Sequence, residues 1–221
     1  MKVISMKICP YVQQVRALLE AKGAKYEVEH IQQGDHPRSE WLLKASPDGG
    51  EVPVLVTDEG ESLFQSDTIV EYLDEVLGDP FLQGTPLERA KDKAWGRLAA
   101  DNYLTQCSTQ RSPDEETLEE RTEDLTPLFA ATEGEIGGGP YFRGEKLRMV
   151  DLSWLPILHR TSLIKKHSDY DFLAGYPKLQ AWREAVLATG IHKNSVSEDF
   201  EDVFTGFYLS DETFLGRKRA N

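Results

Sequence analysis

The order of hydrophobic patterns in the first 78 residues most constrains the fold of this 221-residue chain. Short apolar or alternating runs, typical of strands, take turns with amphipathic segments typical of helices. The strand-like runs cover residues 2–5, 26–30, 52–56 and 62–64, and the helical segments lie around residues 10–22, 38–45 and 67–76. This β-α-β-α-β-β-α order predicts an α/β domain built around a mixed four-stranded sheet.

A segment rich in turn-forming residues follows this domain. Gly78, Pro80, Gly84 and Pro86 come in close succession, and such clusters interrupt helices and strands. The sequence therefore predicts a first domain at residues 1–78, a linker at residues 79–87 and a second domain at residues 88–221. The second domain has helical patterns only, around residues 87–111, 114–135, 151–165 and 177–188, with a looser tail from residue 198.

Charge and composition exclude several classes of function. The formal net charge is -13, so neither a nucleic acid nor an anionic membrane is an expected partner. No apolar run is long enough for a membrane span, and the first residues lack the pattern of a cleaved signal. Cys9 and Cys107 lie far apart and form no pair motif. We expect a reduced, cytoplasmic protein, with one buried disulfide as the alternative.

Cys9 comes directly after the first predicted strand and immediately before the first predicted helix. A thiol at that place faces the unpaired amide groups and the positive end of the helix dipole, which favour a thiolate. Pro10 suits the first helical position because its missing amide hydrogen would be unpaired there anyway. Val12 stands where a Cys-x-x-Cys motif would have its second cysteine, so Cys9 needs an external thiol. The alternative is a buried, inert cysteine.

Two further motifs carry weaker signals. Pro53 interrupts an apolar strand, where it cannot donate to the ladder. Either Pro53 lies on an edge strand, or a cis Val52–Pro53 bond exposes the Val52 backbone to an extended peptide ligand. Gln65 and Ser66 lie at a strand-to-helix turn, where a hydroxyl and free helix amides can bind a carboxylate. Simple helix capping by Ser66 is the alternative.

Together these motifs resemble the glutathione transferase family, most closely its cysteine-dependent omega class. The resemblance implies a thioredoxin-like N-terminal domain and an all-helical C-terminal domain, and it spans nearly the whole chain. The matching residues are Ile4-Ser5-Met6, Cys9-Pro10-Tyr11, Lys22-Gly23, Glu40-Trp41, Lys44, Val52-Pro53-Val54-Leu55, Gln65-Ser66, Glu71-Tyr72-Leu73-Asp74-Glu75, Met149-Val150-Asp151, Phe204 and Tyr208-Leu209.

The same resemblance implies a glutathione site around Cys9, the catalytic residue that would form a mixed disulfide with glutathione. Val52 would hold the cysteinyl backbone across cis-Pro53, and Ser66 would bind the γ-glutamyl carboxylate. Arg38 would face the glycyl carboxylate. The family usually has a lysine there, and the forked guanidinium of arginine suits a carboxylate at least as well. The remaining implied contacts to glutathione are Pro10, Tyr11 and Gln65, and the implied acceptor-pocket residues are Tyr11, Arg160 and Tyr208. For Arg160, a surface or interdomain salt bridge is the alternative.

The chain departs from the family at three positions. Ile157 aligns with an aromatic residue of the family's acceptor pocket, so a different substrate preference is expected. Gln65 replaces the usual acidic residue, so its contact to the γ-glutamyl ammonium loses charge assistance. Arg148 replaces the Ser or Thr that caps the helix starting near Asp151, so Asp151 must cap that helix alone.

The predicted function is glutathione-dependent reduction of mixed disulfides and of dehydroascorbate. Two alternatives stay open: cleavage of glutathionyl adducts of ketones or quinones by the same cysteine, and a non-catalytic binding protein that keeps the fold. Glutathione is the expected co-substrate, a small electrophile or disulfide the second substrate, and no metal is expected. A homodimer is expected from the family. The physiological acceptor substrate does not follow from the sequence, and Cys107 is expected in the core or a pocket wall.

Overall fold

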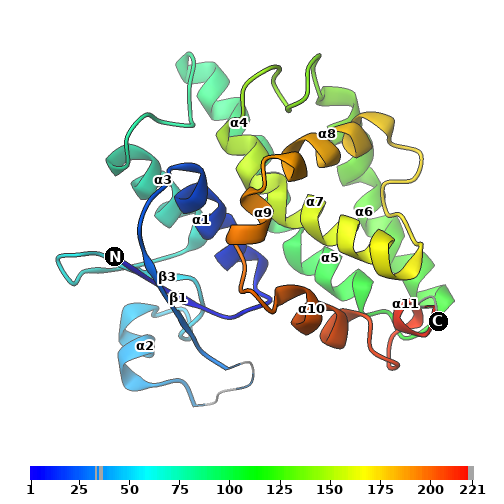
Figure 1. Ribbon diagram of the computed structural model, residues 1–221, viewed down its shortest axis with the longest axis horizontal. Coiled ribbons are helices and arrows are strands. Elements are labelled where there is room, and N and C mark those ends of the chain that lie inside the picture. The colour runs from blue at the N-terminus through cyan, green and yellow to red at the C-terminus, as the bar shows by residue number, and fades with distance from the viewer. Residues whose placement is uncertain (33, 35–36, 219–221) are drawn as a thin grey trace.

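The computed structural model describes residues 1–32, 34 and 37–218 and contains an α/β domain beside a helical domain (Figure 1). Four strands pair in the order β2-β1-β3-β4: β1 (Lys2–Ser5), β2 (Glu27–His30), β3 (Val54–Val56) and β4 (Ser62–Phe64). β1 runs parallel to β2, whereas β1–β3 and β3–β4 are antiparallel. The predicted mixed sheet is therefore confirmed. Val28, Val3, Leu55 and Leu63 lie opposite one another in a row across the four strands.

Three helices complete the first domain: α1 (Pro10–Ala21), α2 (Glu40–Ala45) and α3 (Ser66–Val76). α1 packs against α3. The predicted apolar face of α1 is buried, with Val15, Leu18 and Leu19 fully shielded from solvent. Gly23 ends the helix with a φ of 63°, a left-handed conformation that glycine adopts at little cost.

The second domain consists of helices in the part of the chain that the structure describes. They are α4 (Pro86–Asp101), α5 (Tyr103–Gln110), α6 (Glu115–Glu135), α7 (Met149–Ser168), α8 (Pro177–Ala188), α9 (Ile191–Asn194), α10 (Phe200–Tyr208) and α11 (Phe214–Arg217). Helix α4 begins inside the predicted linker, and the linker bounds stay a prediction.

The single helix predicted around residues 87–111 is wrong, because the chain breaks at Asn102 between α4 and α5. The Asn102 side-chain amide donates to the Leu98 carbonyl at 2.8 Å. The Asn102 backbone N–H bonds to the Ala99 carbonyl instead, at 3.0 Å. The Asn102 side chain thus takes the Leu98 carbonyl that its backbone N–H would bind in a continuous helix. This competition makes Asn unfavourable inside helices.

Helix α7 lies at the centre of the second domain and is longer than the predicted 151–165 segment. Its start depends on Asp151, which is fully buried. Asp151 Oδ2 accepts from the Arg148 backbone N–H at 2.7 Å, and Oδ1 accepts from the Phe142 N–H at 2.9 Å and from Trp182 Nε1 at 2.7 Å. As predicted, Asp151 caps the helix without side-chain help from Arg148. Burial raises the pKa of Asp151 to about 6.

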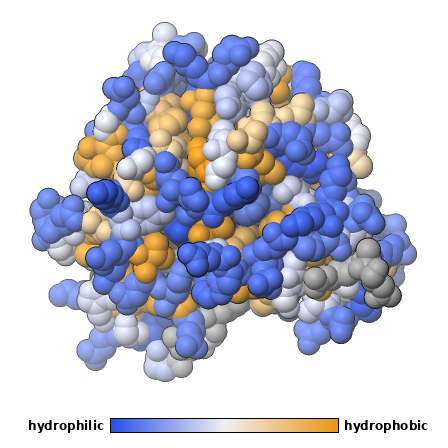
Figure 2. All heavy atoms as spheres, in the orientation of Figure 1, coloured by the Kyte–Doolittle hydropathy of each residue, from blue (hydrophilic) through white to orange (hydrophobic). Residues whose placement is uncertain are grey.

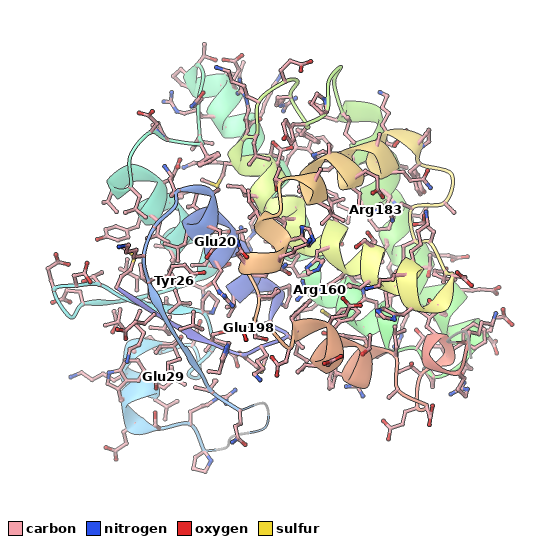
Figure 3. The ribbon with its side chains drawn as sticks, in the orientation of Figure 1. Glu20, Tyr26, Glu29, Arg160, Arg183 and Glu198 are labelled. Carbon is pink, nitrogen blue, oxygen red and sulfur yellow. The ribbon has the colours of Figure 1, made fainter. Side chains whose placement is uncertain are left out.

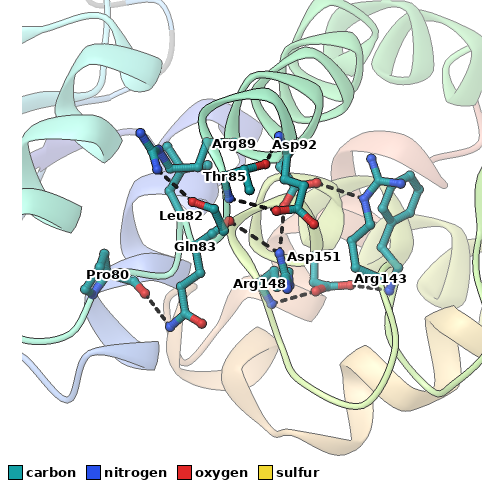
Figure 4. Close-up of polar contacts among 12 residues, drawn as sticks. Pro80, Leu82, Gln83, Thr85, Arg89, Asp92, Arg143, Arg148 and Asp151 are labelled. Carbon is teal, nitrogen blue, oxygen red and sulfur yellow. Dashed lines mark hydrogen bonds and ion pairs between the residues drawn. The ribbon is translucent and has the colours of Figure 1, made fainter.

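Buried carboxylates also lie on either side of the segment between α3 and α4. Asp74 accepts from the backbone N–H groups of Phe81 and Leu82, at 2.7 and 3.0 Å. Asp92, on α4, is 1% exposed and pairs with Arg143 at 2.9 Å and with Arg148 at 3.6 Å (Figure 4). Asp74 thus holds the connecting segment against α3, and Asp92 joins α4 to the loop before α7.

Hydrophilic side chains cover much of the face seen in Figure 2, with apolar clusters between them. Among the described residues, no helix combines the length and the apolar character that crossing a membrane requires. Both cysteines are free, so the alternative of one buried disulfide is wrong.

Candidate active site

Cys9 lies between β1 and α1, where the sequence predicts it. It is the N-cap residue of α1, and Pro10 occupies the first turn. The thiol is 7% exposed, and its Sγ donates to the Val52 carbonyl at 3.7 Å. The Val52–Pro53 bond is cis, as expected. The first helix and the proline loop therefore meet at one sulfur atom.

The sequence predicts a lowered pKa for Cys9, and this prediction is wrong. Burial raises the pKa of the thiol to about 11, while the amides of Val12 and Tyr11 and the charge of Arg160 act in the opposite direction. The helix amides thus stabilise the thiolate, as the sequence suggests. The loss of solvation around the buried anion has the larger effect, so the pKa rises. In this structure the thiol is protonated at neutral pH.

A cleft of about 230 Å³ lies next to the proline loop. Five residues predicted to touch glutathione line it: Tyr11, Val52, Pro53, Gln65 and Ser66. Cys9 lies behind this wall, in contact with Val52. The structure therefore brings five of the predicted glutathione contacts together around one concave surface.

The start of α3 forms one end of this cleft. Gln65 is the N-cap residue, with a φ of 68°, and its side chain makes no capping hydrogen bond. The first amides of a helix have no partner within it, so they can bind an anion such as a carboxylate. The Gln65 side chain instead donates from Nε2 to Asp48 Oδ2 at 2.7 Å. A carboxylate ligand is therefore compatible with this end of the cleft.

Sequence reasoning missed the charged residues that line the same cleft. Asp67, Arg97 and Asp101 line the cleft, together with Glu51 and Ala100. Arg97 Nε pairs with Asp101 at 2.8 Å, and Arg97 Nη1 pairs with Asp67 at 3.2 Å. The spacing of Arg97 and Asp101 indicates a helical ion pair, but nothing in it signals that α4 borders a cleft of the first domain.

Three predicted site residues lie elsewhere in the structure. Arg38 donates from Nη1 to the Gln32 carbonyl at 3.4 Å and is not among the described residues that line the cleft. Arg160 is fully buried, and Tyr208 is 4% exposed. Burial, followed by the nearby Cys107, raises the pKa of Tyr208. Their roles toward the glycyl carboxylate and the acceptor stay predictions.

A larger cavity of about 460 Å³ lies between α3 and α4. Its lining includes Gln14, Asp74 and Met149, but neither Cys9 nor the proline loop. The smaller cleft, by contrast, is lined by Val52, whose carbonyl contacts the Cys9 thiol. Within the described part of the chain, no group of three or more His, Cys, Asp or Glu side chains could hold a metal ion.

Comparisons with known proteins agree with this arrangement. The family model for the glutathione S-transferase N-terminal domain matches residues 3–80, and that for the C-terminal domain matches residues 115–185. Glutathione S-transferase U28 of Arabidopsis thaliana is 30% identical over 202 residues, which cover 88% of this chain and 86% of that protein. Glutathione S-transferase omega-1 of Sus scrofa is 29% identical over 189 residues, with 84% and 76% covered.

A solved structure of rice glutathione S-transferase GST1 in complex with glutathione has the same fold. It superimposes with a TM-score of 0.78 at 20% identity and covers 94% of this chain and 95% of its own. The family-model matches lie in both the α/β domain and the helical domain. This chain therefore belongs to the glutathione S-transferase family.

Proposed function

We propose that this protein is a glutathione-dependent thiol transferase and reductase in which Cys9 carries glutathione as a mixed disulfide. The observation that carries the proposal is the contact between the Cys9 thiol and the Val52 carbonyl at 3.7 Å. This contact puts a nucleophile directly behind a cleft suited to a peptide. A hydroxyl at that place would only activate the glutathione thiol, whereas a cysteine can form a disulfide with it.

The proposed cycle has two exchanges. The Cys9 thiolate attacks the glutathionyl sulfur of a mixed disulfide, the old S–S bond breaks, and the substrate leaves as a thiolate that takes up a proton. The thiolate of a second glutathione then attacks the Cys9–glutathione disulfide and leaves as oxidised glutathione, which restores Cys9. Dehydroascorbate would gain its two electrons and two protons from two glutathione molecules. Val12 in place of a second cysteine is the reason for the external thiol.

Binding of glutathione would use both sides of the cleft. The Val52 backbone would pair with the cysteinyl unit, and Ser66 with the first amides of α3 would hold the γ-glutamyl carboxylate. Since Gln65 carries no charge, we propose that the γ-glutamyl ammonium faces Asp67 and Asp101, which line the same cleft. Arg38 would reach the glycyl carboxylate, and Tyr11 would contact the acceptor.

The omega-1 relative supports the assignment to the cysteine-dependent branch of the family. The U28 relative has a similar identity to this chain, so other transferase activities are alternatives. Because the proposed nucleophile is a cysteine, we expect weak conjugation of aryl halides.

Because reduction consumes reduced glutathione, we propose a cytoplasmic location. We also propose a homodimer, to be checked by sedimentation.

Substitution of the nucleophile tests the proposed reaction. Cys9→Ser should lower turnover of a glutathione mixed disulfide by roughly a thousandfold or more, because serine cannot form the covalent intermediate. Cys107→Ser is the matched control and should keep the wild-type rate. Turnover would be followed by coupling oxidised glutathione to its reductase. Undiminished activity of Cys9→Ser would rule out the redox role of this cysteine.

A further inference from the structure

Arg160, on α7, is a fully buried cation held only by neutral groups. Its Nη2 donates to the Ile8 carbonyl at 3.0 Å, and its Nη1 donates to the Pro156 carbonyl at 3.2 Å and to Gln13 Oε1. Its Nε has no hydrogen-bond partner. No carboxylate of the described residues forms an ion pair with it within 4.0 Å. A buried charge without a counter-ion is costly, so its retention calls for an explanation.

Arg183 shows how the same fold treats a buried arginine in its structural framework. It is 1% exposed, and its two terminal nitrogens bind the two oxygens of Asp171 at 2.9 and 3.3 Å. Figure 3 shows the two arginines apart, with Arg183 on α8 and Arg160 near the middle of the molecule, between α1 and α10. Arg160 therefore differs from Arg183 in lacking an anion, and not in burial.

The ionisable groups close to Arg160 leave one candidate for that anion. Burial raises the pKa values of Tyr103 and Tyr208, so both phenols stay neutral. Burial lowers the pKa of His159, so the imidazole is neutral as well. The remaining acid whose ionisation the Arg160 charge favours is Cys9.

The surroundings of the Cys9 thiol point to the same conclusion. The titratable groups that interact with it are Arg160 from α7, Cys107 and Tyr103 from α5, Tyr11 from α1 and Tyr208 from α10. Of these, Arg160 is the one cation. The Ile8 carbonyl that accepts from Arg160 also belongs to the residue directly before Cys9.

We infer that Arg160 is a positioning residue that holds the Ile8–Cys9 turn and serves as the counter-ion of the Cys9 thiolate. The inference deepens the proposed function and rests on it. When the Cys9 thiol releases its proton to solvent, the sulfur anion and the guanidinium form a pair that compensates both buried charges. In the subsequent attack on a disulfide, the thiolate forms the new S–S bond while the old S–S bond breaks, and the leaving sulfur departs as a thiolate. The positive charge of Arg160 thereby counteracts part of the desolvation that opposes ionisation of Cys9.

The rival explanation is that Arg160 only joins the two domains through its hydrogen bonds to Ile8 and Gln13. The two explanations differ in the effect of charge. A lysine at position 160 keeps the positive charge but cannot reproduce the fork of hydrogen bonds. If the charge matters to Cys9, lysine should preserve its ionisation better than an uncharged side chain of similar length.

The experiment measures the rate at which a small neutral reagent alkylates Cys9 at pH 8, in a Cys107→Ser background, with the product identified by mass. The rate is proportional to the thiolate fraction when the pKa lies above the assay pH. Arg160→Met should slow alkylation about tenfold, which corresponds to one pH unit in the pKa, whereas Arg160→Lys should stay within about threefold of the parent. Arg183→Lys is the matched control at a paired buried arginine and should leave the rate unchanged.

Equal rates for Arg160→Met and the parent would overturn the inference, as would an Arg160→Lys rate as low as that of Arg160→Met. If Arg160→Met does not fold, Gln13→Glu takes its place. It keeps Arg160 but supplies a permanent carboxylate partner, so alkylation should slow about tenfold, and an unchanged rate would contradict the inference. Because alkylation needs neither glutathione nor a disulfide, absence of reductase activity would refute the proposed function without affecting this result.

Discussion

At the scale of single residues, opposing effects meet at Cys9. Its place before Pro10 at the start of a helix is readable from the sequence, and so is the favourable effect of the helix amides on a thiolate. The burial that raises its pKa to about 11 is not readable, because it depends on the tertiary surroundings of the thiol. The pKa of this thiol therefore depends on surroundings that only the folded chain supplies.

Ser66 offers a test of the glutathione site at the same scale. Ser66→Ala should raise the KM for glutathione about tenfold, because one charge-assisted hydrogen bond to the γ-glutamyl carboxylate is lost. The kcat should change little, since Ser66 does not take part in the exchange. Steady-state kinetics with varied glutathione checks this expectation. Thr68→Ala, at an exposed position two residues further along α3, is the control, and an equal KM for Ser66→Ala and wild type would remove Ser66 from the site.

At the scale of secondary-structure elements, the helices with strong local signals were predictable. Asp114 accepts from the Thr117 N–H at 2.8 Å and starts α6 as expected, and Gly23 ends α1. The break between α4 and α5 was not predictable, because it depends on whether the Asn102 side chain turns back to the Leu98 carbonyl. Local sequence therefore fixes helix starts better than interruptions.

The connection between α7 and α8 makes stability depend on pH. Burial tends to raise the pKa of Asp171, but hydrogen bonds from Arg183 and Lys165 outweigh this and lower it to about 2, against 3.8 for an isolated aspartate. Because the folded-state pKa is lowered, the stabilising contribution is complete above about pH 4 and is lost as the pH falls through 2.

Asp171→Asn should accordingly lower the free energy of unfolding at pH 7 by roughly 2–4 kcal/mol, since Arg183 would keep a buried charge without its partner. The difference from wild type should narrow steadily between pH 4 and pH 2. Urea unfolding at several pH values measures it. The exposed Asp124 on α6 provides the control substitution, Asp124→Asn. A difference that stays constant down to pH 2 would contradict the assigned ion pair.

At the scale of the whole molecule, the site depends on how the two domains meet. The sequence predicts the mixed sheet, the cis-proline and five residues of the cleft through local patterns and family resemblance. It does not predict that Arg97 and Asp101 of α4 face Asp67 of α3, or that Arg160 of α7 reaches the carbonyl before Cys9. These residues are far apart in the chain, and their proximity arises only from packing between domains.

The central claim is that Cys9 forms a disulfide with glutathione, and intact-protein mass spectrometry after incubation with oxidised glutathione tests it most directly. The account predicts a gain of one glutathionyl group by the wild-type protein and by Cys107→Ser, and none by Cys9→Ala. An unmodified wild-type protein, or an adduct that persists in Cys9→Ala, would contradict it.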